Sequence, residues 1–335
     1  MNDTQYTLNF EKLCNELQLG ELISSPKPIS GGLLHRMYAI ETTQANYAVK
    51  ALNPQIMIRP TAVQNYIDSE KIANVVAEHI HAQPAKRLKG AYMHNIDNQF
   101  YLIFDWIEGQ RLEQDEVTIN NSFLMGTILA DIHKTDFRQL ELDSSQVTNS
   151  KKIDWMFYLN KGKNENSEWI EILDSNMDKL YEWSMKAKNS SSILASDNVI
   201  SHRDLEPKNV MWREDIPIII DWESAGYINP MHDLVETAVY WSVDSSGSLN
   251  KGKFLAFIAG YEKRVGSLTA NWEVVLDNGF AGKLDWLEYS LKRSLWIECT
   301  DVDEQLVGTS QVIWTLDALK QYENMISDIK IWLNT

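Results

Sequence analysis

The sequence predicts an α+β chain with two unequal lobes, the first rich in β-strands and the second mainly helical. Residues 37–41 and 46–51 alternate between apolar and polar side chains, as the two strands of a hairpin do. Beyond residue 230, apolar side chains recur at helical spacing. The composition, with 44% hydrophobic and 23% charged residues over 335 positions, is ordinary for a globular protein. A chain of this kind binds its ligands in a cleft between lobes.

The N-terminal third carries further strand, turn and helix patterns. A turn at 29–32 precedes the hairpin, and apolar spacing of three to five residues predicts a helix over 62–80. Residues 99–107 form an apolar, aromatic-rich run that predicts a buried strand, which Glu-Gly at 108–109 ends.

The remainder of the chain contains one strand–turn–strand unit among helices. Residues 121–134 form an amphipathic pattern, and 151–187 are helical in spacing with a polar break at 161–166. The run NVMW-REDI-PIIID over 209–221 predicts an embedded hairpin. After Pro230, helical faces are predicted from Leu234, Ala238 and Trp241, and from the leucines at 284, 287, 291 and 295.

The net charge and the two cysteines disfavour several classes of protein. The formal net charge of −16 disfavours nucleic acid and anionic membranes as partners and favours a cationic small molecule. No apolar stretch approaches the ~18–20 residues that span a bilayer. Cys14 and Cys299 fit no disulfide framework or metal spacing, so free thiols are expected. With no signal peptide visible, we expect a cytoplasmic protein. The oligomeric state is not predicted.

The segment SHRDLEPKNVMWREDIPIIID at 201–221 is the most informative about chemistry. Asp204 follows His202 by two residues, Asn209 follows Asp204 by five, and Asp221 follows Asn209 by twelve. Because the predicted hairpin begins at Asn209 and ends at Asp221, antiparallel pairing should place these two side by side. One carboxylate can accept a hydroxyl proton, while an amide oxygen and a second carboxylate can hold Mg²⁺ on a nucleotide. His202 is expected to hold the loop and not to act as the base.

Two charged residues upstream fit the same chemistry. Lys50 ends the alternating strand YAVK, where it can reach nucleotide phosphates or simply face solvent. Glu70, twenty residues later, lies near the apolar face of the predicted helix and could hold the Lys50 ammonium. Glu78 is the competing acidic residue on that helix.

Three further positions each allow a functional and a structural interpretation. Gly31 and Gly32 allow the backbone to approach phosphates, or form an ordinary turn. Asp233 is either the N-cap of the following helix or a brace for the loop that contains Asp204.

These residues resemble the aminoglycoside phosphotransferase family, the small-molecule branch of the protein-kinase-like fold. The resemblance runs from the Gly-Gly turn at 31–32 to Asp233 and rests on HxDxxxxN…IIDW and on FDWIEG at 104–109. It implies a bilobal fold: a nucleotide-binding lobe over 1–104 with a five-stranded sheet and one helix, a hinge at 105–109, and a helical lobe over 110–335 that holds the catalytic loop and acceptor site.

The resemblance also implies residue roles. Asp204 would be the catalytic base, or the group that orients the acceptor hydroxyl. Asn209 and Asp221 would hold Mg²⁺. Lys50 would contact the α- and β-phosphates and pair with Glu70.

The base of the nucleotide would meet the hinge. The Asp105 carbonyl and the Ile107 N–H would hydrogen-bond the base, with Phe104 as the gatekeeper behind them.

Some features depart from protein kinases. Asp-Trp-Glu replaces Asp-Phe-Gly at 221–223, Glu206 stands where those enzymes have a catalytic-loop lysine, and no activation segment follows. By contrast, Arg203 lies between His202 and Asp204, where protein kinases also have an arginine. These points favour a small acceptor over a protein substrate.

The sequence leaves the acceptor open. We expect ATP or GTP as donor and a hydroxylated, aminated acceptor such as an aminoglycoside. The alternatives are a choline-, amino-sugar- or homoserine-like metabolite, or a catalytically silent nucleotide-binding protein. The acids Asp301, Asp303 and Glu304 could bind ammonium groups or form a solvated loop, and the aromatics around 240–241 and 286–296 could stack on the acceptor or pack in the core.

Overall fold

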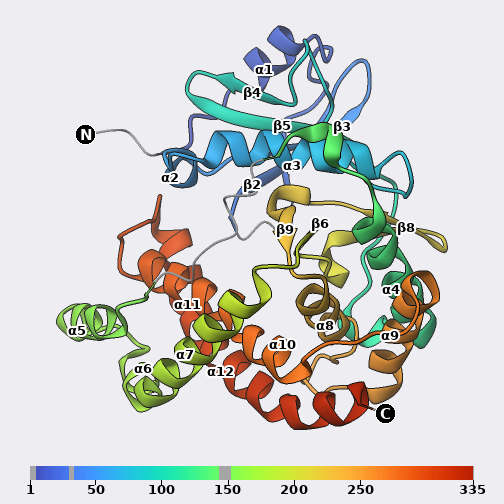
Figure 1. Cartoon of the computed structure of the whole chain (residues 1–335). Helices are drawn as coiled ribbons and strands as arrows, with labels where there is room; N and C mark the ends of the chain where they lie inside the picture. Colours follow the sequence, from blue (N-terminus) through green and yellow to red (C-terminus); the bar gives the residue numbers. More distant parts are fainter. Residues whose placement is uncertain (1–4, 30–33, 143–151, 335) are drawn as a thin grey trace. The chain divides into compact units, whose positions relative to one another are not determined.

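The computed structural model describes residues 5–29, 34–142 and 152–334. By their internal contacts they form two compact units, which are described one at a time (Figure 1). Unit 1 comprises Met1–Glu113, Thr135–Leu142 and Asp204–Ala225, and unit 2 comprises Gln114–Lys134, Asp143–Arg203 and Gly226–Thr335. The predicted fold class is confirmed, because a five-stranded antiparallel sheet is followed by a mainly helical region.

Unit 1 contains the sheet and the segment around Asp204. Its elements are α1 (Phe10–Leu17), β1 (Lys27–Ile29), β2 (Arg36–Glu41), β3 (Asn46–Ala51), α2 (Pro54–Met57), α3 (Ala62–Val76), β4 (Met93–Ile96), β5 (Gln99–Asp105), β7 (Val210–Arg213) and β8 (Ile216–Ile219), with short 3-10 helices η2 (Arg138–Leu140), η4 (Pro207–Asn209) and η5 (Trp222–Ser224). The predicted hairpin is confirmed as β2–β3, whereas the helix ends at Val76 and the strand at Asp105, both earlier than predicted.

The sheet has the strand order β1-β2-β3-β5-β4, and every neighbouring pair is antiparallel. Tyr47, Val49 and Ala51 on β3 pack into one buried cluster with Leu13 of α1, which Figure 1 shows beside the sheet. Since successive strand residues point to opposite faces, Lys50 projects from the face away from α1. The alternation of a single strand thus separates the core from the position of the lysine.

Segment 204–225 belongs to unit 1 through backbone hydrogen bonds. Ile219 of β8 donates to the carbonyl of His81 and accepts from the amide of Gln83, both at 2.8 Å. Trp212 of β7 exchanges two backbone hydrogen bonds with Gln110. These bonds are why the compact units differ from the predicted lobes, which placed the catalytic loop with residues 110–335. The lobes and the hinge at 105–109 stay predictions about functional parts.

Unit 2 is almost entirely helical. Its elements are η1 (Gln114–Glu116), α4 (Ile119–Lys134), α5 (Trp155–Glu165), α6 (Ile170–Ser175), α7 (Met177–Leu194), β6 (Val199–Ser201), β9 (Gly226–Ile228), α8 (Pro230–Tyr240), α9 (Lys251–Val265), α10 (Trp272–Asn278), α11 (Phe280–Ser294) and α12 (Val302–Leu333). The strands β6 and β9 pair with each other. None of the helices in the described ranges combines the length and hydropathy needed to cross a membrane.

Large aromatic side chains build the core of unit 2. Trp155, Trp169 and Trp183 are fully buried with the predicted leucine face of α11 and with α12. Trp183 stacks on Phe280, with ring centroids 5.6 Å apart. Core packing therefore accounts for these tryptophans, and burial of such large rings dominates core energetics.

Helices α4 and α9 approach each other closely at two glycines. A Cβ atom on Gly126 would lie 2.0 Å from the carbonyl oxygen of Phe257, and one on Gly260 would lie 2.0 Å from that of Phe123. In both cases the nearest atom belongs to the backbone and not to a flexible side chain, so an added methyl group would have to push the two helices apart. Glycine at both positions therefore lets α4 and α9 pack with their backbones in direct contact.

Candidate active site

Lys50 is buried and contacts two carboxylates. Its Nζ lies 2.5 Å from Oδ1 of Asp221 and 2.7 Å from Oε2 of Glu223. Burial by itself would lower the pKa of Lys50, but the two carboxylates more than compensate and raise it. The side chain is therefore a cation, and two of its three N–H donors face these carboxylates.

Asp221 has an unusual backbone conformation. Its φ of 63° and ψ of 62° lie in the left-handed region, which costs a residue other than glycine about 1–3 kcal/mol. The next residue, Trp222, is only 2% exposed and anchors the turn. Strain of this kind persists where the surrounding structure imposes it and is typical of functional sites.

The predicted pair of Lys50 with Glu70 is not formed. Glu70 is buried on α3, and its Oε2 accepts a hydrogen bond from the backbone amide of Ala85 at 2.5 Å. Within the described residues, the carboxylates at ion-pair distance from Lys50 are Asp221 and Glu223. The physical reason is that both groups find nearer partners. Burial then raises the pKa of Glu70 to about 7, although the Ala85 amide and the charge of Lys50 lower it.

Glu78, the competing acid, lies beyond the last residue of α3 and is exposed. Gly31 and Gly32 lie outside the described residues.

Asp204 and Asn209 are joined directly. The Asn209 Nδ2 donates to the backbone carbonyl of Asp204 at 2.8 Å and to its Oδ2 at 2.9 Å. Lys208 lies 3.7 Å from the other carboxylate oxygen of Asp204 and 3.0 Å from Glu206. Burial and the charge of Glu206 raise the pKa of Asp204 to about 8, against the opposing charge of Lys208. A carboxylate with a pKa near neutrality is suited to accept a proton.

The predicted neighbourhood of Asn209 and Asp221 is supported by the hairpin. Strands β7 and β8 pair from Val210 to Ile219, and the Ile220 amide donates to the Asn209 carbonyl at 3.0 Å. Asp221 is the next residue in the chain.

The orientation of Asn209 suits a magnesium ligand. Both partners of its Nδ2 are oxygen acceptors, so the amide nitrogen must face them and the amide oxygen faces away. Magnesium bound to a nucleotide takes one or two protein oxygens besides phosphate and water. The amide oxygen of Asn209 and the carboxylate of Asp221 are donors of this type, so the residues fit the ion.

The predicted hinge residues follow the end of β5. Phe104 is buried opposite Ala48 of β3. The Asp105 carbonyl accepts a hydrogen bond from the side chain of Gln83, and the Asp105 carboxylate pairs with Lys86 at 2.6 Å. Ile107 is partly buried, and its N–H has no protein partner in the described part of the chain. A nucleotide base would therefore share the Asp105 carbonyl with Gln83.

Sequence reasoning assigned no role to four residues that contact the predicted site. Glu223 holds Lys50, Lys208 lies beside Asp204, and Gln83 binds the hinge carbonyl. His35 contacts Glu223. Only Glu223 had a visible signal, since the glutamate of Asp-Trp-Glu stands where protein kinases have glycine. Lys208 lies within the segment at 201–221 but at a position to which the pattern gives no role, and His35 and Gln83 come from loops without a motif.

Unit 2 contains a separate buried polar cluster. The His133 ring of α4 lies 2.8 Å through Nε2 from Asp233 of α8 and 2.8 Å through Nδ1 from the Tyr261 hydroxyl of α9. Burial would raise the pKa of Asp233, but His133 and the nearby Ser201 side chain lower it below its ordinary value. The N-cap interpretation of Asp233 is wrong, because Asn229 caps α8.

The acidic cluster at 301–304 has a structural explanation. Asp301 accepts from the Glu304 amide at 3.0 Å, and the Glu304 carboxylate accepts from the Thr300 amide at 2.9 Å. Asp301 is thus the N-cap of α12, and Glu304 ties down the residue that precedes the cap. Helix capping accounts for two of the three acids that the sequence offered as ammonium ligands.

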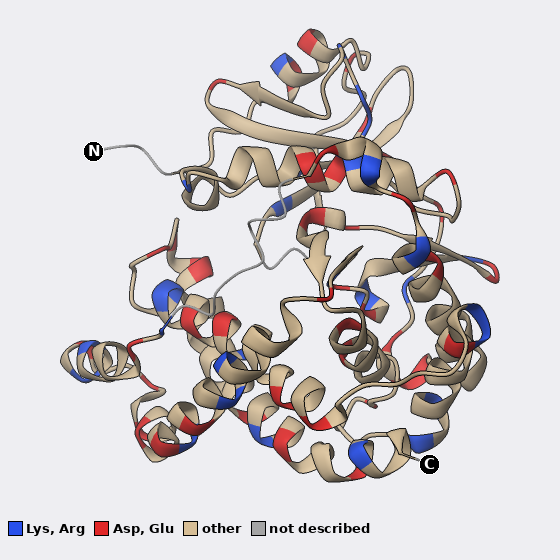
Figure 2. Cartoon of the chain, viewed as in Figure 1, with Lys and Arg blue, Asp and Glu red and all other residues tan. Residues whose placement is uncertain are grey.

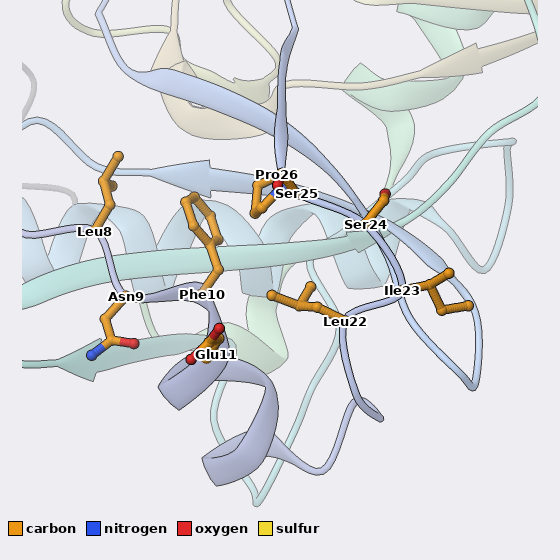
Figure 3. Close-up of a pocket in the computed structure, with 9 residues that line it drawn as sticks. All are labelled: Leu8, Asn9, Phe10, Glu11, Leu22, Ile23, Ser24, Ser25 and Pro26. Carbon is orange, nitrogen blue, oxygen red and sulfur yellow. The ribbon is translucent and has the colours of Figure 1, made fainter.

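The surface gives little further guidance to a ligand site. Figure 2 shows acidic positions on elements of both units, interspersed with basic ones. A hollow of about 460 Å³ is lined by residues 8–11 and 22–26 of unit 1 (Figure 3). No predicted site residue lines it.

Fold and site together define a class of protein. A five-stranded sheet with a buried lysine, and a loop with carboxylate, amide and second carboxylate at these spacings, are the parts of a kinase-like phosphotransferase. The sequence matches the model of the phosphotransferase enzyme family over residues 25–265. The chain belongs to that family and is a small-molecule phosphotransferase, which confirms the predicted family. Among curated proteins, none matches the sequence significantly.

Solved structures share the fold at low sequence identity. A spectinomycin phosphotransferase in complex with ADP and spectinomycin is 13% identical, with a TM-score of 0.66 over 92% of this chain and 98% of that one. An ethanolamine kinase of Plasmodium vivax is 15% identical, with a TM-score of 0.55 over 88% and 82%. An amicoumacin kinase in complex with AMP-PNP, Ca²⁺ and its substrate is 12% identical, with a TM-score of 0.53 over 93% and 94%.

Proposed function

We propose that this protein transfers the γ-phosphoryl group of ATP or GTP to a hydroxyl of a small aminated molecule, such as an aminoglycoside, in the cytoplasm. The observation that carries the proposal is that Asp204, Asn209, Asp221 and Lys50 belong to one compact unit and are linked by hydrogen bonds, ion pairs and mutual electrostatic effects. Metal-assisted phosphoryl transfer depends on the positioning of these groups.

Each group has a distinct task. Asp204 accepts the proton of the acceptor hydroxyl or orients that hydroxyl, and Asn209 holds its carboxylate in place. Lys50 contacts the α- and β-phosphates. Lys208, beside Asp204, adds positive charge where the transferred phosphoryl group accumulates negative charge.

Asn209 and Asp221 would hold Mg²⁺, which neutralises phosphate charge when it is bound. The Ile107 N–H and the Asp105 carbonyl bind the nucleotide base. Relatives of the same fold carry ADP or AMP-PNP, which supports a nucleotide donor.

The acceptor class rests on charge and on relatives. A net charge of −16 favours a cationic acceptor. Spectinomycin and ethanolamine, the compounds named for two relatives, both carry amines and hydroxyls. Choline-like, amino-sugar and homoserine-like metabolites are the alternative acceptors.

An acceptor screen tests the proposal. The purified chain with Mg·ATP or Mg·GTP is incubated with aminoglycosides, spectinomycin, choline, ethanolamine and amino sugars, and release of ADP or GDP is followed. At least one aminated acceptor should raise nucleotide turnover well above the rate without acceptor. Nucleotide binding without acceptor-dependent turnover would instead favour a catalytically silent nucleotide-binding protein.

The variant Asp204→Ala assigns the turnover to this site. It should abolish acceptor-dependent turnover while binding of Mg·AMP-PNP stays within about threefold of wild type, because the carboxylate acts on the acceptor and not on the nucleotide. Retained turnover together with lost nucleotide binding would contradict the role of Asp204.

A further inference from the structure

Glu223 is the carboxylate that links Lys50 to a second buried side chain. Its Oε2 lies 2.7 Å from the Lys50 ammonium and 3.4 Å from Nε2 of His35. Only 15% of the Glu223 side chain is exposed. The same oxygen therefore lies beside both groups.

The hydrogen bonds of His35 fix its tautomer. The backbone amide of Asn53 donates to Nδ1 at 2.8 Å, so Nδ1 is the unprotonated nitrogen. Nε2 then carries the proton and donates it to the Tyr66 hydroxyl at 2.5 Å, while the Glu223 carboxylate lies farther away, at 3.4 Å. Burial and the charge of Lys50 hold the pKa of His35 well below its ordinary value, so the ring is neutral and remains a single-proton donor.

His35 is itself held from several sides. Asn53 caps the start of α2 and is 1% exposed, and Tyr66 is a buried residue of α3. These contacts leave the His35 ring little freedom to rotate. A ring locked in this way packs beside Glu223 in one position, as the support of a functional side chain requires.

Glu70, by comparison, has a different partner. The amide of Ala85 occupies its Oε2, and Lys50 acts on Glu70 only through longer-range charge. We propose that Glu223, packed beside His35, is the positioning residue that holds Lys50 for the nucleotide phosphates, in the place for which the sequence predicted Glu70. This inference rests on the proposed function, since it assigns a support for the nucleotide lysine.

Nucleotide affinity tests the inference without knowledge of the acceptor. Binding of AMP-PNP with Mg²⁺ to the full chain is measured by calorimetry for wild type, Glu223→Gln, Glu70→Gln and the exposed control Glu78→Gln. Glu223→Gln should weaken binding about 10- to 100-fold, as expected for the loss of a charge-assisted hydrogen bond. Glu70→Gln should weaken it at least about fivefold less than that, and Glu78→Gln should match wild type.

A double-mutant cycle with Lys50→Met identifies the residue through which Glu223 acts. In the Lys50→Met background, Glu223→Gln should cause no further loss of affinity, because its target is gone. Additive losses would mean a purely structural effect and would overturn the inference. Thermal unfolding is recorded for each variant, and if Glu223→Gln does not fold, Glu223→Asp takes its place, with a smaller loss expected.

The outcomes distinguish the inference from the proposed function. A wild-type chain that binds no nucleotide would contradict the proposed function itself. A wild-type chain that binds, together with a folded Glu223→Gln variant of equal affinity, would overturn only the inference.

Discussion

The polar cluster of unit 1 and that of unit 2 are both buried, but their carboxylates respond to burial in opposite ways. In unit 1, burial raises the pKa of Asp204 to about 8 and that of Glu223 to about 7, and neighbouring carboxylates add to both. In unit 2, the Asp233 side chain is only 3% exposed, against 32% for Asp204, yet His133 lowers its pKa below the ordinary value. The difference lies in compensation, by which we mean how far nearby opposite charges and hydrogen-bond donors offset the cost of burying a charged carboxylate.

Uncompensated burial is typical of functional sites, whereas a buried carboxylate that is compensated by a partner strongly destabilises the fold when one member of the pair is removed. In unit 1, Asp204 and Glu70 have pKa values that burial raises, so their charged forms oppose folding and they bind a proton more readily than exposed acids do. Asp233 is already paired with a histidine that also contacts Tyr261. We therefore expect substitutions in unit 1 to change activity and pH dependence, and substitutions in unit 2 to change stability.

The largest expected effect is on the stability of unit 2. Asp233→Ala should lower the free energy of unfolding by about 3–5 kcal/mol, because it leaves the donor of a buried His133 without its acceptor. Urea unfolding followed by circular dichroism measures this loss. Asp233→Asn, which keeps an acceptor oxygen, should lose clearly less. A loss below about 1 kcal/mol for Asp233→Ala would break the comparison.

The second prediction concerns the pH dependence of stability in unit 1. Because the pKa of Glu70 rises from 4.5 to about 7 on folding, the folded chain binds this proton more tightly than the unfolded chain does. The free energy of unfolding therefore falls as pH rises from about 4.5 through 7, by about 3 kcal/mol from this group. Below pH 4.5 the effect is absent.

Glu70→Gln removes this titration. Urea unfolding at pH 5, 6, 7 and 8 should show a stability that falls less steeply with pH for Glu70→Gln than for wild type. The difference between the two slopes is the measured quantity, so a constant offset from the new amide does not matter. Parallel curves would mean that Glu70 is compensated in the way that Asp233 is.

A third prediction tests how unit 2 holds its cluster. Gly126→Ala should lower the free energy of unfolding by about 1–3 kcal/mol, because the added methyl group must push α9 away from α4, which positions His133. Gly282→Ala on α11 is the control, since the nearest atom to a Cβ there is a Glu236 carboxylate oxygen at 3.8 Å, an ordinary van der Waals contact. Nucleotide affinity of Gly126→Ala should equal that of wild type at temperatures where the variant is folded.

The smallest effect is expected at the start of α12. Asp301→Ala removes the N-cap and should cost about 1 kcal/mol of stability, with no change in the KM of the acceptor found by the screen. Steady-state kinetics beside thermal unfolding measures both. A raised KM would show that this carboxylate of unit 2 binds the acceptor, and the comparison between the units would need revision.

The sequence predicted the structural features that depend on residues close together in the chain. The hairpin of β2 and β3 follows from alternation, and the leucine face of α11 follows from helical spacing. The adjacency of Asn209 and Asp221 follows from one short hairpin, whose strands pair from Val210 to Ile219. Each of these predictions needs only local geometry, in which the chain between two residues fixes their separation.

Partner choice was decided by tertiary structure. Lys50 and Asp221 are 171 residues apart in the chain, and Asp233 and His133 are 100 apart, so no local period relates them. Glu70 binds the Ala85 amide because the loop that contains Ala85 lies beside α3. Glu223 binds Lys50 because the strained turn at Asp221 places it there. The sequence by itself determined the family, the fold class and the order of the chemical groups. Only the folded chain decided which carboxylates are compensated, because that depends on burial and on neighbours brought together from distant segments.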